Sequence, residues 1–195
     1  MSLFTEIKES AEGRELSVRW YQDRVRALGK LKAGTVIREG KADAMAQSRP
    51  QFGMLNLFNY RPKDPMRIPY YDIFPLVLPV RRLKTGFAGL NLHYLPIPMR
   101  VSLLEMIAAG YGDETAQTAV VTWDKVKALR YVAPTIRQYN KKKVGSLFLR
   151  IPLDDMLIGA LLPVQQFYSG EYNKRKKVHN NKVYKGSREK INYGT

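Results

Sequence analysis

The residues of this chain that could do chemistry are mostly cationic, and they gather in two places. Lys141, Lys142 and Lys143 are adjacent, and the segment Glu171–Thr195 carries eight cations against two glutamates, with tyrosines between them. The cations of that segment are Lys174, Arg175, Lys176, Lys177, Lys182, Lys185, Arg188 and Lys190. Such cations can neutralise DNA phosphates, and tyrosines can stack on exposed bases. Both clusters are therefore candidate contacts for a polyanion or a neighbouring subunit, and a solvated surface is the alternative.

The charge of the whole chain points the same way. Its 195 residues include 33 lysines and arginines against 17 acidic residues, which gives a net charge of +16 and a pI near 10.0. This excess favours a polyanionic partner or an acidic protein surface. For Lys141–Lys143 a second interpretation stays open, because cations also stabilise the C-terminal turn of a helix, here one that starts near Pro134.

Residues for catalysis or metal binding are scarce. The chain has no cysteine and two histidines, His93 and His179, so a zinc site would depend mainly on carboxylates. Asp154 and Asp155 follow Pro152, which is typical of a helix start, and no partnering base or phosphate loop stands nearby. For His93 we predict a structural hydrogen bond. We therefore expect no enzyme activity, no metal, no cofactor and no small-molecule substrate.

The stretch Gln51–Leu95 is predicted to form the centre of the fold, as a meander of three antiparallel strands. The strands are expected at Met54–Tyr60, Tyr71–Val80 and Phe87–Tyr94, with a turn at 84–86 before the third. In the first, Leu55 and Leu57 alternate with Met54, Phe58 and Tyr60. The prolines make the second strand an edge, and glycine marks a bulge in the third. The residues expected to build this motif are Tyr70, Tyr71, Asp72, Pro75, Pro79, Gly89, Asn91, His93 and Tyr94.

The remaining elements predict an α+β fold: a small curled antiparallel sheet or partly open barrel near residues 53–95, with several short helices and extended termini. Residues 1–50 are expected to form an N-terminal helix and arm, 51–170 the core domain and 171–195 a basic tail. Further elements are predicted as helices at 14–28, from Pro96 (buried stripe Val101, Leu104, Ile107, Ala108) and at 123–130, and as strands at 119–121, 146–151 and 160–167. In 146–151, Leu147, Leu149 and Ile151 fall on one face and Phe148 on the other. The basic tail has too little apolar surface to order itself, so we expect it to need a partner. No stretch predicts a signal peptide or a membrane span.

Three segments resemble small virion proteins of contractile-tailed bacteriophages. They are YYDIFPLVLPV (70–80), GFAGLNLHYLPIPMR (86–100) and IPLDDMLIGALLPVQQF (151–167), which is followed by the lysine-rich tail. The resemblance implies a non-enzymatic structural component of the tail, baseplate or neck, which docks through its core and holds neighbouring virion proteins with its basic termini. It also implies a location in the virion, after assembly in the host cytoplasm. The alternative is a protein that binds packaged DNA, or the ends of that DNA, through the basic tail.

Overall fold

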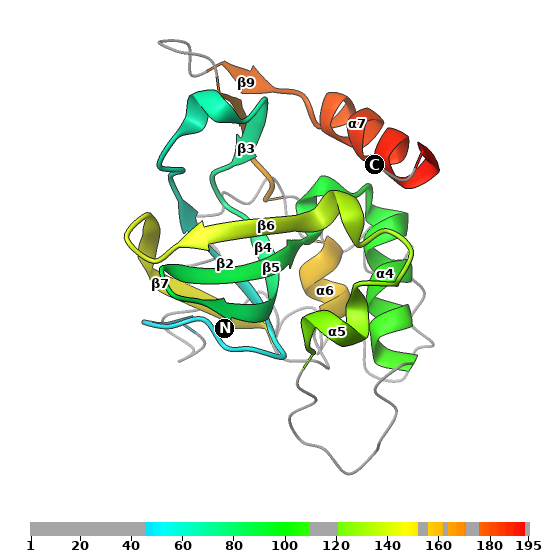
Figure 1. The fold of residues 1–195 in the computed structure, drawn as a ribbon, viewed down its shortest axis with the longest axis horizontal. Helices are drawn as coiled ribbons and strands as arrows, with labels where there is room; N and C mark the ends of the chain where they lie inside the picture. Colours follow the sequence, from blue (N-terminus) through cyan, green and yellow to red (C-terminus); the bar gives the residue numbers. More distant parts are fainter. Residues whose placement is uncertain (1–45, 110–120, 152–155, 162–163, 171–175, 194–195) are drawn as a thin grey trace, which may run out of the picture.

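The computed structural model describes residues 46–109, 121–151, 156–161, 164–170 and 176–193. Within these ranges, six antiparallel strands form the main sheet (Figure 1). In spatial order they are β1 (Ala46–Gln47), β7 (Val144–Ile151), β2 (Leu55–Tyr60), β4 (Leu76–Leu83), β5 (Gly86–Asn91) and β6 (Ile136–Asn140). Helices and strands are combined as an α+β fold, as the sequence predicted.

The connection between β6 and β7 forces the sheet to curl. Only Lys141–Lys143 join these strands, although β2, β4 and β5 lie between them in the sheet. In a flat sheet β6 and β7 would be about 19 Å apart, whereas the connecting backbone reaches roughly 14 Å. A tight turn closes the connection, in which the Lys143 amide donates to the Asn140 carbonyl at 2.9 Å. The sheet therefore bends strongly without closing into a barrel, since β6 and β7 do not pair.

One face of the curled sheet is aliphatic and packs against helices. Leu55 and Leu57 of β2 and Leu149 and Ile151 of β7 are fully buried there, so the predicted alternation of both strands is confirmed. The helices that contribute to this core are α4 (Ile97–Ala109), α5 (Trp123–Val126) and α6 (Met156–Leu161).

The opposite face is aromatic, and it is the concave one. The rings of Phe58 in β2 and Tyr139 in β6 lie 5.2 Å apart between centroids, although two strands separate them. In a flat sheet those strands would be about 14 Å apart. Phe87 and Phe148 likewise approach to 6.4 Å across two intervening strands. The curl therefore wraps around these rings.

A second, three-stranded sheet carries the C-terminal part of the chain. Its strands are β3 (Tyr70–Asp72), β8 (Phe167–Ser169) and β9 (Lys177–Val178), and α7 (Asn180–Tyr193) follows. Three short 3-10 turns connect the elements: η1 (Pro65–Arg67), η2 (Leu92–Tyr94) and η3 (Ala133–Thr135). In Figure 1, β3, β9 and α7 lie together on one side of the main sheet.

The second predicted strand, Tyr71–Val80, is wrong in both extent and position. Its first residues belong to β3 in the other sheet, and β4 lies between β2 and β5 and is no edge strand. Pro75 falls in the gap between β3 and β4. Pro79 stands beside the register shift between Pro79 and Arg81, and β4 pairs with β2 only through Leu76 and Val77. Neither proline therefore withholds a hydrogen bond that the sheet requires.

The third predicted strand ends earlier than expected, at Asn91. The Asn91 side chain accepts a hydrogen bond from the His93 amide at 3.0 Å, which starts the turn η2. The irregularity expected at Gly89 lies in its partner strand β4. A β-carbon on Gly89 would meet the Val77 side chain and the Leu78 carbonyl, so this position has room only for glycine.

Three helix predictions and one strand prediction need correction. In α4, Ala108 is exposed, and Arg100 and Leu103 are buried beside the predicted Val101, Leu104 and Ile107. The predicted helix 123–130 is shorter, and after η3 the chain enters β6. Lys141–Lys143 therefore form a strand-to-strand turn, and the interpretation as a helix end is wrong. The strand predicted at 160–167 starts as the end of α6, with β8 beginning at its last residue.

The described part of the basic tail is ordered on the protein itself, which the composition argument did not anticipate. Val183 and Ser187 of α7 are buried, and Tyr184 and Ile191 pack partly against the body. The Ser187 hydroxyl donates to the Tyr94 carbonyl at 2.7 Å. Apolar residues at helical spacing give the segment one buried face, so a strongly charged composition does not prevent packing.

Several predictions lie outside the described residues. These are the N-terminal helix 14–28, most of the arm that follows it, most of the short strand 119–121, and the residues Asp154, Asp155, Lys174 and Arg175. The end of the arm is described, and there β1 adds a strand to the edge of the main sheet beside β7.

Candidate nucleic-acid interface

A basic hollow with a volume of about 790 Å³ lies beside the β4–β5 and β6–β7 turns. Five cations line it, and no acidic residue does. The cations are Arg49, Arg82, Lys84, Lys141 and Arg150. We call this feature the basic hollow. Its electrostatic character follows from this lining, because positive charges in a concave surface attract and concentrate anions.

Turns and strand ends position these cations. Arg82 lies at the end of β4, Lys84 lies in the turn between β4 and β5, and Lys141 begins the turn between β6 and β7. Arg82 stacks over the ring of Phe52 at 4.6 Å from its centroid. Arg150 of β7 donates to the Arg49 carbonyl at 2.9 and 3.2 Å, which ties the segment after β1 to the sheet. In the described part of the chain, none of the five cations forms an ion pair.

Only one of the predicted cations lines the basic hollow. Lys141, Lys142 and Lys143 are all exposed, but Lys141 alone contributes to the lining. The tail cations that are described lie elsewhere, at exposed positions just before β9, in β9 and on α7: Lys176, Lys177, Lys182, Lys185, Arg188 and Lys190. The predicted clusters therefore supply two separate basic surfaces.

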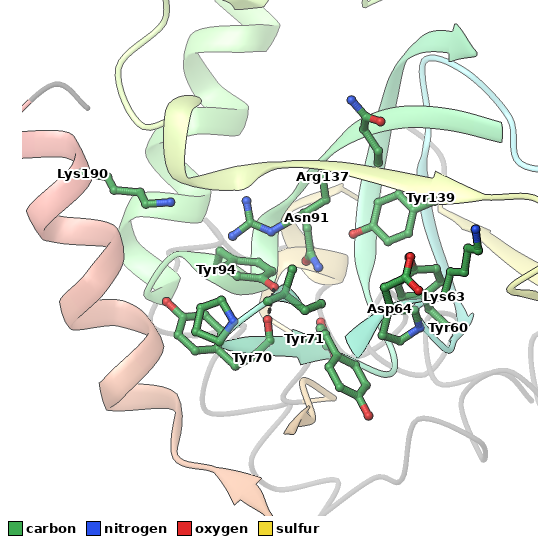
Figure 2. A pocket seen from close by; sticks show the side chains of 15 residues that line it. Tyr60, Lys63, Asp64, Tyr70, Tyr71, Asn91, Tyr94, Arg137, Tyr139 and Lys190 are labelled. Atoms are coloured by element: carbon green, nitrogen blue, oxygen red, sulfur yellow. Dashed lines mark hydrogen bonds between the residues drawn. The ribbon is translucent and has the colours of Figure 1, made fainter. Parts of the chain in front are cut away.

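A second cavity, of about 480 Å³, has an aromatic lining, and we call it the tyrosine pocket (Figure 2). The tyrosines that line it are Tyr60, Tyr70, Tyr71, Tyr94 and Tyr139. Burial raises the pKa of Tyr60, Tyr70 and Tyr94, and it raises that of Tyr139 most strongly. The hydroxyls therefore stay uncharged near neutral pH and do not repel an anion.

A cation stands against the aromatic wall of this pocket. The guanidinium carbon of Arg137 lies 3.7 Å from the centroid of the Tyr94 ring, and Figure 2 shows the two groups stacked, with Asn91 beside them. Among the described residues no carboxylate forms an ion pair with Arg137. Lys63 and Lys190 are exposed and also belong to the lining, as does the exposed Asp64.

Asp72 also lines the tyrosine pocket, but its hydrogen bonds are made within the protein. Its carboxylate accepts from the Phe74 and Gln166 amides at 3.0 and 3.2 Å and lies 2.7 Å from His93 Nδ1. Both side chains of the pair are almost fully enclosed, at 1% and 0% exposure. Burial lowers the pKa of His93, although the Asp72 carboxylate opposes this effect. The predicted structural hydrogen bond of His93 is confirmed, and the pair has no open position for a substrate.

A buried arginine connects this region to α7. Arg100 is fully buried, and it donates to the Leu95 carbonyl at 2.7 Å, the Ala160 carbonyl at 3.2 Å and the Tyr184 hydroxyl at 3.0 Å. These bonds join α4, α6 and α7. Within the described residues, no three acidic, histidine or cysteine side chains group as a metal site, and no helix could cross a membrane.

Sequence reasoning missed the main parts of both cavities. Arg49, Arg82, Lys84 and Arg150 stand singly or in pairs along the chain, and Arg137 is likewise isolated. Their grouping depends on which strands become neighbours. The one local signal was the sequence RRLK at 81–84, next to a recognisable hairpin turn.

Comparison with known proteins gave one family. The model of the phage T4 terminal DNA protecting protein family matches residues 5–187. No significant match was found among curated proteins or among solved structures. The match confirms the expected resemblance to a bacteriophage protein family. It does not support the expected assignment to the tail, baseplate or neck. Because the family model covers most of the chain, this protein belongs to the phage T4 terminal DNA protecting protein family.

Proposed function

We propose that this protein binds the ends of linear phage DNA and shields them, without catalysing a reaction. The basic hollow carries this proposal. It gathers five cations and no carboxylate in one concave surface, which is the arrangement that a phosphate backbone requires. The name of the matched family, terminal DNA protecting protein, supplies the part of the proposal that concerns the ends.

Two cations of the hollow are already positioned for phosphates. Arg82 is held by its stacking on Phe52, and Arg150 by its bonds to the Arg49 carbonyl. A side chain that is fixed before binding loses less conformational freedom when it takes up a phosphate. The exposed face of α7, with Lys182, Lys185 and Arg188, adds positive charge for less specific attraction.

A competition experiment tests the preference for ends. A fluorescent linear duplex bound by the protein is challenged with unlabelled linear DNA or with a covalently closed minicircle of the same sequence. We expect the linear competitor to be clearly stronger, and we expect bound protein to slow digestion of the linear duplex by an exonuclease. Equal competition by the two forms would show DNA binding without end recognition and would contradict the proposal.

Neutralising the hollow tests its role. Each lost phosphate contact lowers the slope of log affinity against log salt by about 0.9 on duplex DNA. The variant R82Q/K84Q/K141Q should therefore lower the slope by up to about 2.7. The control R67Q/R81Q/R130Q removes three exposed arginines that line neither cavity, and Arg81 is the immediate neighbour of Arg82. An equal change in both variants would mean that net charge acts alone and that the hollow is no binding site.

A role as a virion component remains a second proposal. After α7 packs on the body, Lys182, Lys185 and Arg188 still face outward on one helix, which suits an acidic surface on a neighbouring protein. The protein would then be assembled in the host cytoplasm and retained in the particle at the DNA end. Mass spectrometry of purified particles tests this location, and absence of the chain from particles would contradict it.

A further inference from the structure

We propose that the tyrosine pocket receives the terminal nucleotide of one DNA strand, unstacked from the duplex. This inference rests on the proposed binding of DNA ends and adds a recognition site to it. The base would lie among the tyrosine rings, and its phosphate would meet Arg137.

The size and the lining of the pocket suit a nucleotide. Its volume of about 480 Å³ lies within the range of roughly 300–1,000 Å³ that is usual for small-molecule sites. Two pairs of rings form its sides: Tyr60 lies 4.9 Å from Tyr139, and Tyr70 lies 5.9 Å from Tyr94. Figure 2 shows these pairs apart, with Asn91 between them. Tyr94 and Tyr139 are almost fully buried, whereas Tyr60 and Tyr70 are half-buried and keep exposed ring surface. The base would therefore stack on Tyr60 or Tyr70, and aromatic stacking accepts any of the four bases.

The cations of the pocket suit the phosphate. Arg137 rests on the Tyr94 ring and donates to the Ile136 carbonyl, and no carboxylate pairs with it in the described structure. The other N–H groups of its guanidinium are therefore available to an anion. Lys63 and Lys190 lie on opposite sides in Figure 2. Two acidic residues also line the pocket. Asp64 is exposed, and the carboxylate of the buried Asp72 is already hydrogen-bonded to His93 and two backbone amides.

The position of the pocket relative to the basic hollow favours the end of a DNA strand as its ligand over an internal nucleotide. Both cavities lie along β5 and beside β6: Phe87 of β5 and Lys141, directly after β6, line the hollow, whereas Asn91 of β5 and Arg137 of β6 line the pocket. From residue 87 to residue 91 a strand advances about 13 Å, which is the length of a few nucleotides. A terminal base has one stacking neighbour, and an internal base has two, so the terminal base costs less to displace.

Binding measurements with two duplexes test the inference. One duplex ends in a single unpaired nucleotide, 5′ or 3′, and the other has the same length with both ends closed by hairpin loops. We expect the wild-type protein to prefer the open duplex by roughly tenfold, the size of one base–aromatic stacking contact. Arg137→Gln and Tyr60→Leu should lose most of this preference and bind the closed duplex within about twofold of wild type.

The matched control is Arg130→Gln. Arg130 is exposed and also stacks on a tyrosine, 5.1 Å from the Tyr131 ring centroid, but it does not line the pocket. This variant should keep the preference for the open duplex. If Arg130→Gln loses the preference as strongly as Arg137→Gln does, the pocket assignment is overturned.

Photocrosslinking supplies a test that does not depend on a variant. A 5-iododeoxyuridine placed at the unpaired terminal position should crosslink to peptides containing Tyr60 or Tyr70, and the same base placed internally should not. Terminal crosslinks confined to other peptides would overturn the inference. The inference would also be overturned if free dAMP bound in the pocket and left the affinity for the open duplex unchanged, because the site would then serve free nucleotides.

The two proposals fail in different ways. If the wild-type protein binds neither duplex, DNA binding itself is refuted. If it binds open and closed duplexes equally, the recognition of DNA ends is refuted together with the pocket inference. If it prefers the open duplex, and Arg137→Gln and Tyr60→Leu keep that preference, the pocket inference alone is refuted and the binding of DNA ends stands.

Discussion

Arg100 is the residue whose replacement should most clearly reveal what holds α7 on the body. It is fully buried, and its three hydrogen bonds reach the Leu95 carbonyl, the Ala160 carbonyl and the Tyr184 hydroxyl. Arg100→Met keeps most of the aliphatic stem and removes the guanidinium. The substitution therefore separates the effect of the polar contacts from the effect of simple packing.

The expected magnitude follows from the groups left behind. Leu95 and Ala160 are fully buried, so their carbonyls lose a donor and gain no water, at about 1–3 kcal/mol each. Removal of a buried charge acts in the opposite direction, because burial lowers the pKa of Arg100 and its cationic form is therefore costly in the core. The net loss in free energy of unfolding should be about 2–4 kcal/mol, or roughly 5–15 °C in Tm.

Urea and thermal denaturation measure this loss, and amide hydrogen exchange locates it. Exchange should accelerate first in α7, since Tyr184 loses its bond to the core. Arg81→Met is the control, because Arg81 is exposed and should change stability by no more than about 0.5 kcal/mol. A variant Arg100→Met that equals or exceeds the wild type in stability would refute the reasoning, since the cost of the buried charge would then outweigh its bonds.

Three further predictions concern other positions. Burial lowers the pKa of His93 below its usual 6.5, so at acidic pH the unfolded chain binds a proton that the folded state excludes. The free energy of unfolding should therefore fall as the pH decreases below about 6.5, by at most about 1.4 kcal/mol per pH unit. Urea denaturation should show a weaker pH dependence in His93→Gln than in the control His179→Gln, whose histidine is exposed. A pH dependence unchanged in His93→Gln would contradict the assignment. Gly86→Ala should cost about 1–3 kcal/mol in thermal unfolding, because the new β-carbon meets the Tyr139 carbonyl on β6, and wild-type stability would show that the β5–β6 pair has room to spare. Ser187→Ala should cost about 1 kcal/mol and raise hydrogen exchange in α7, because the Tyr94 carbonyl loses its bond, and unchanged exchange in α7 would argue against this anchor.

The sequence predicted best where a strand has one aliphatic and one aromatic face. The alternation of Leu55 and Leu57 with Phe58, and of Leu149 with Phe148, placed each side chain on its correct face, because a period of two is a local property. The prediction of the second strand failed, because the structural effect of a proline depends on which strand lies beside it. Pro75 and Pro79 predicted an edge strand, whereas Pro75 lies in the gap before β4 and Pro79 beside a bulge, so β4 has a neighbour on both sides.

The candidate sites could not be predicted as sites, because their members come from distant segments. Arg49 and Arg150 meet although about a hundred residues separate them, and Arg137 reaches Tyr94 through the pairing of β5 with β6. Net charge indicated a polyanionic partner or an acidic protein surface but gave no location. The long lysine-rich tail attracted attention by its composition, whereas α7 owes its position to a few apolar residues and to Tyr184.

The short segment Lys141–Lys143 makes the curvature of the sheet a matter of covalent connectivity as well as of side-chain packing. Truncating a ring on the concave face would loosen the interior without allowing the sheet to flatten, since the connection still limits the distance between β6 and β7. A circular permutant with new termini inside this segment would lack that limit. Comparing the two would show how much of the architecture is imposed by chain length alone.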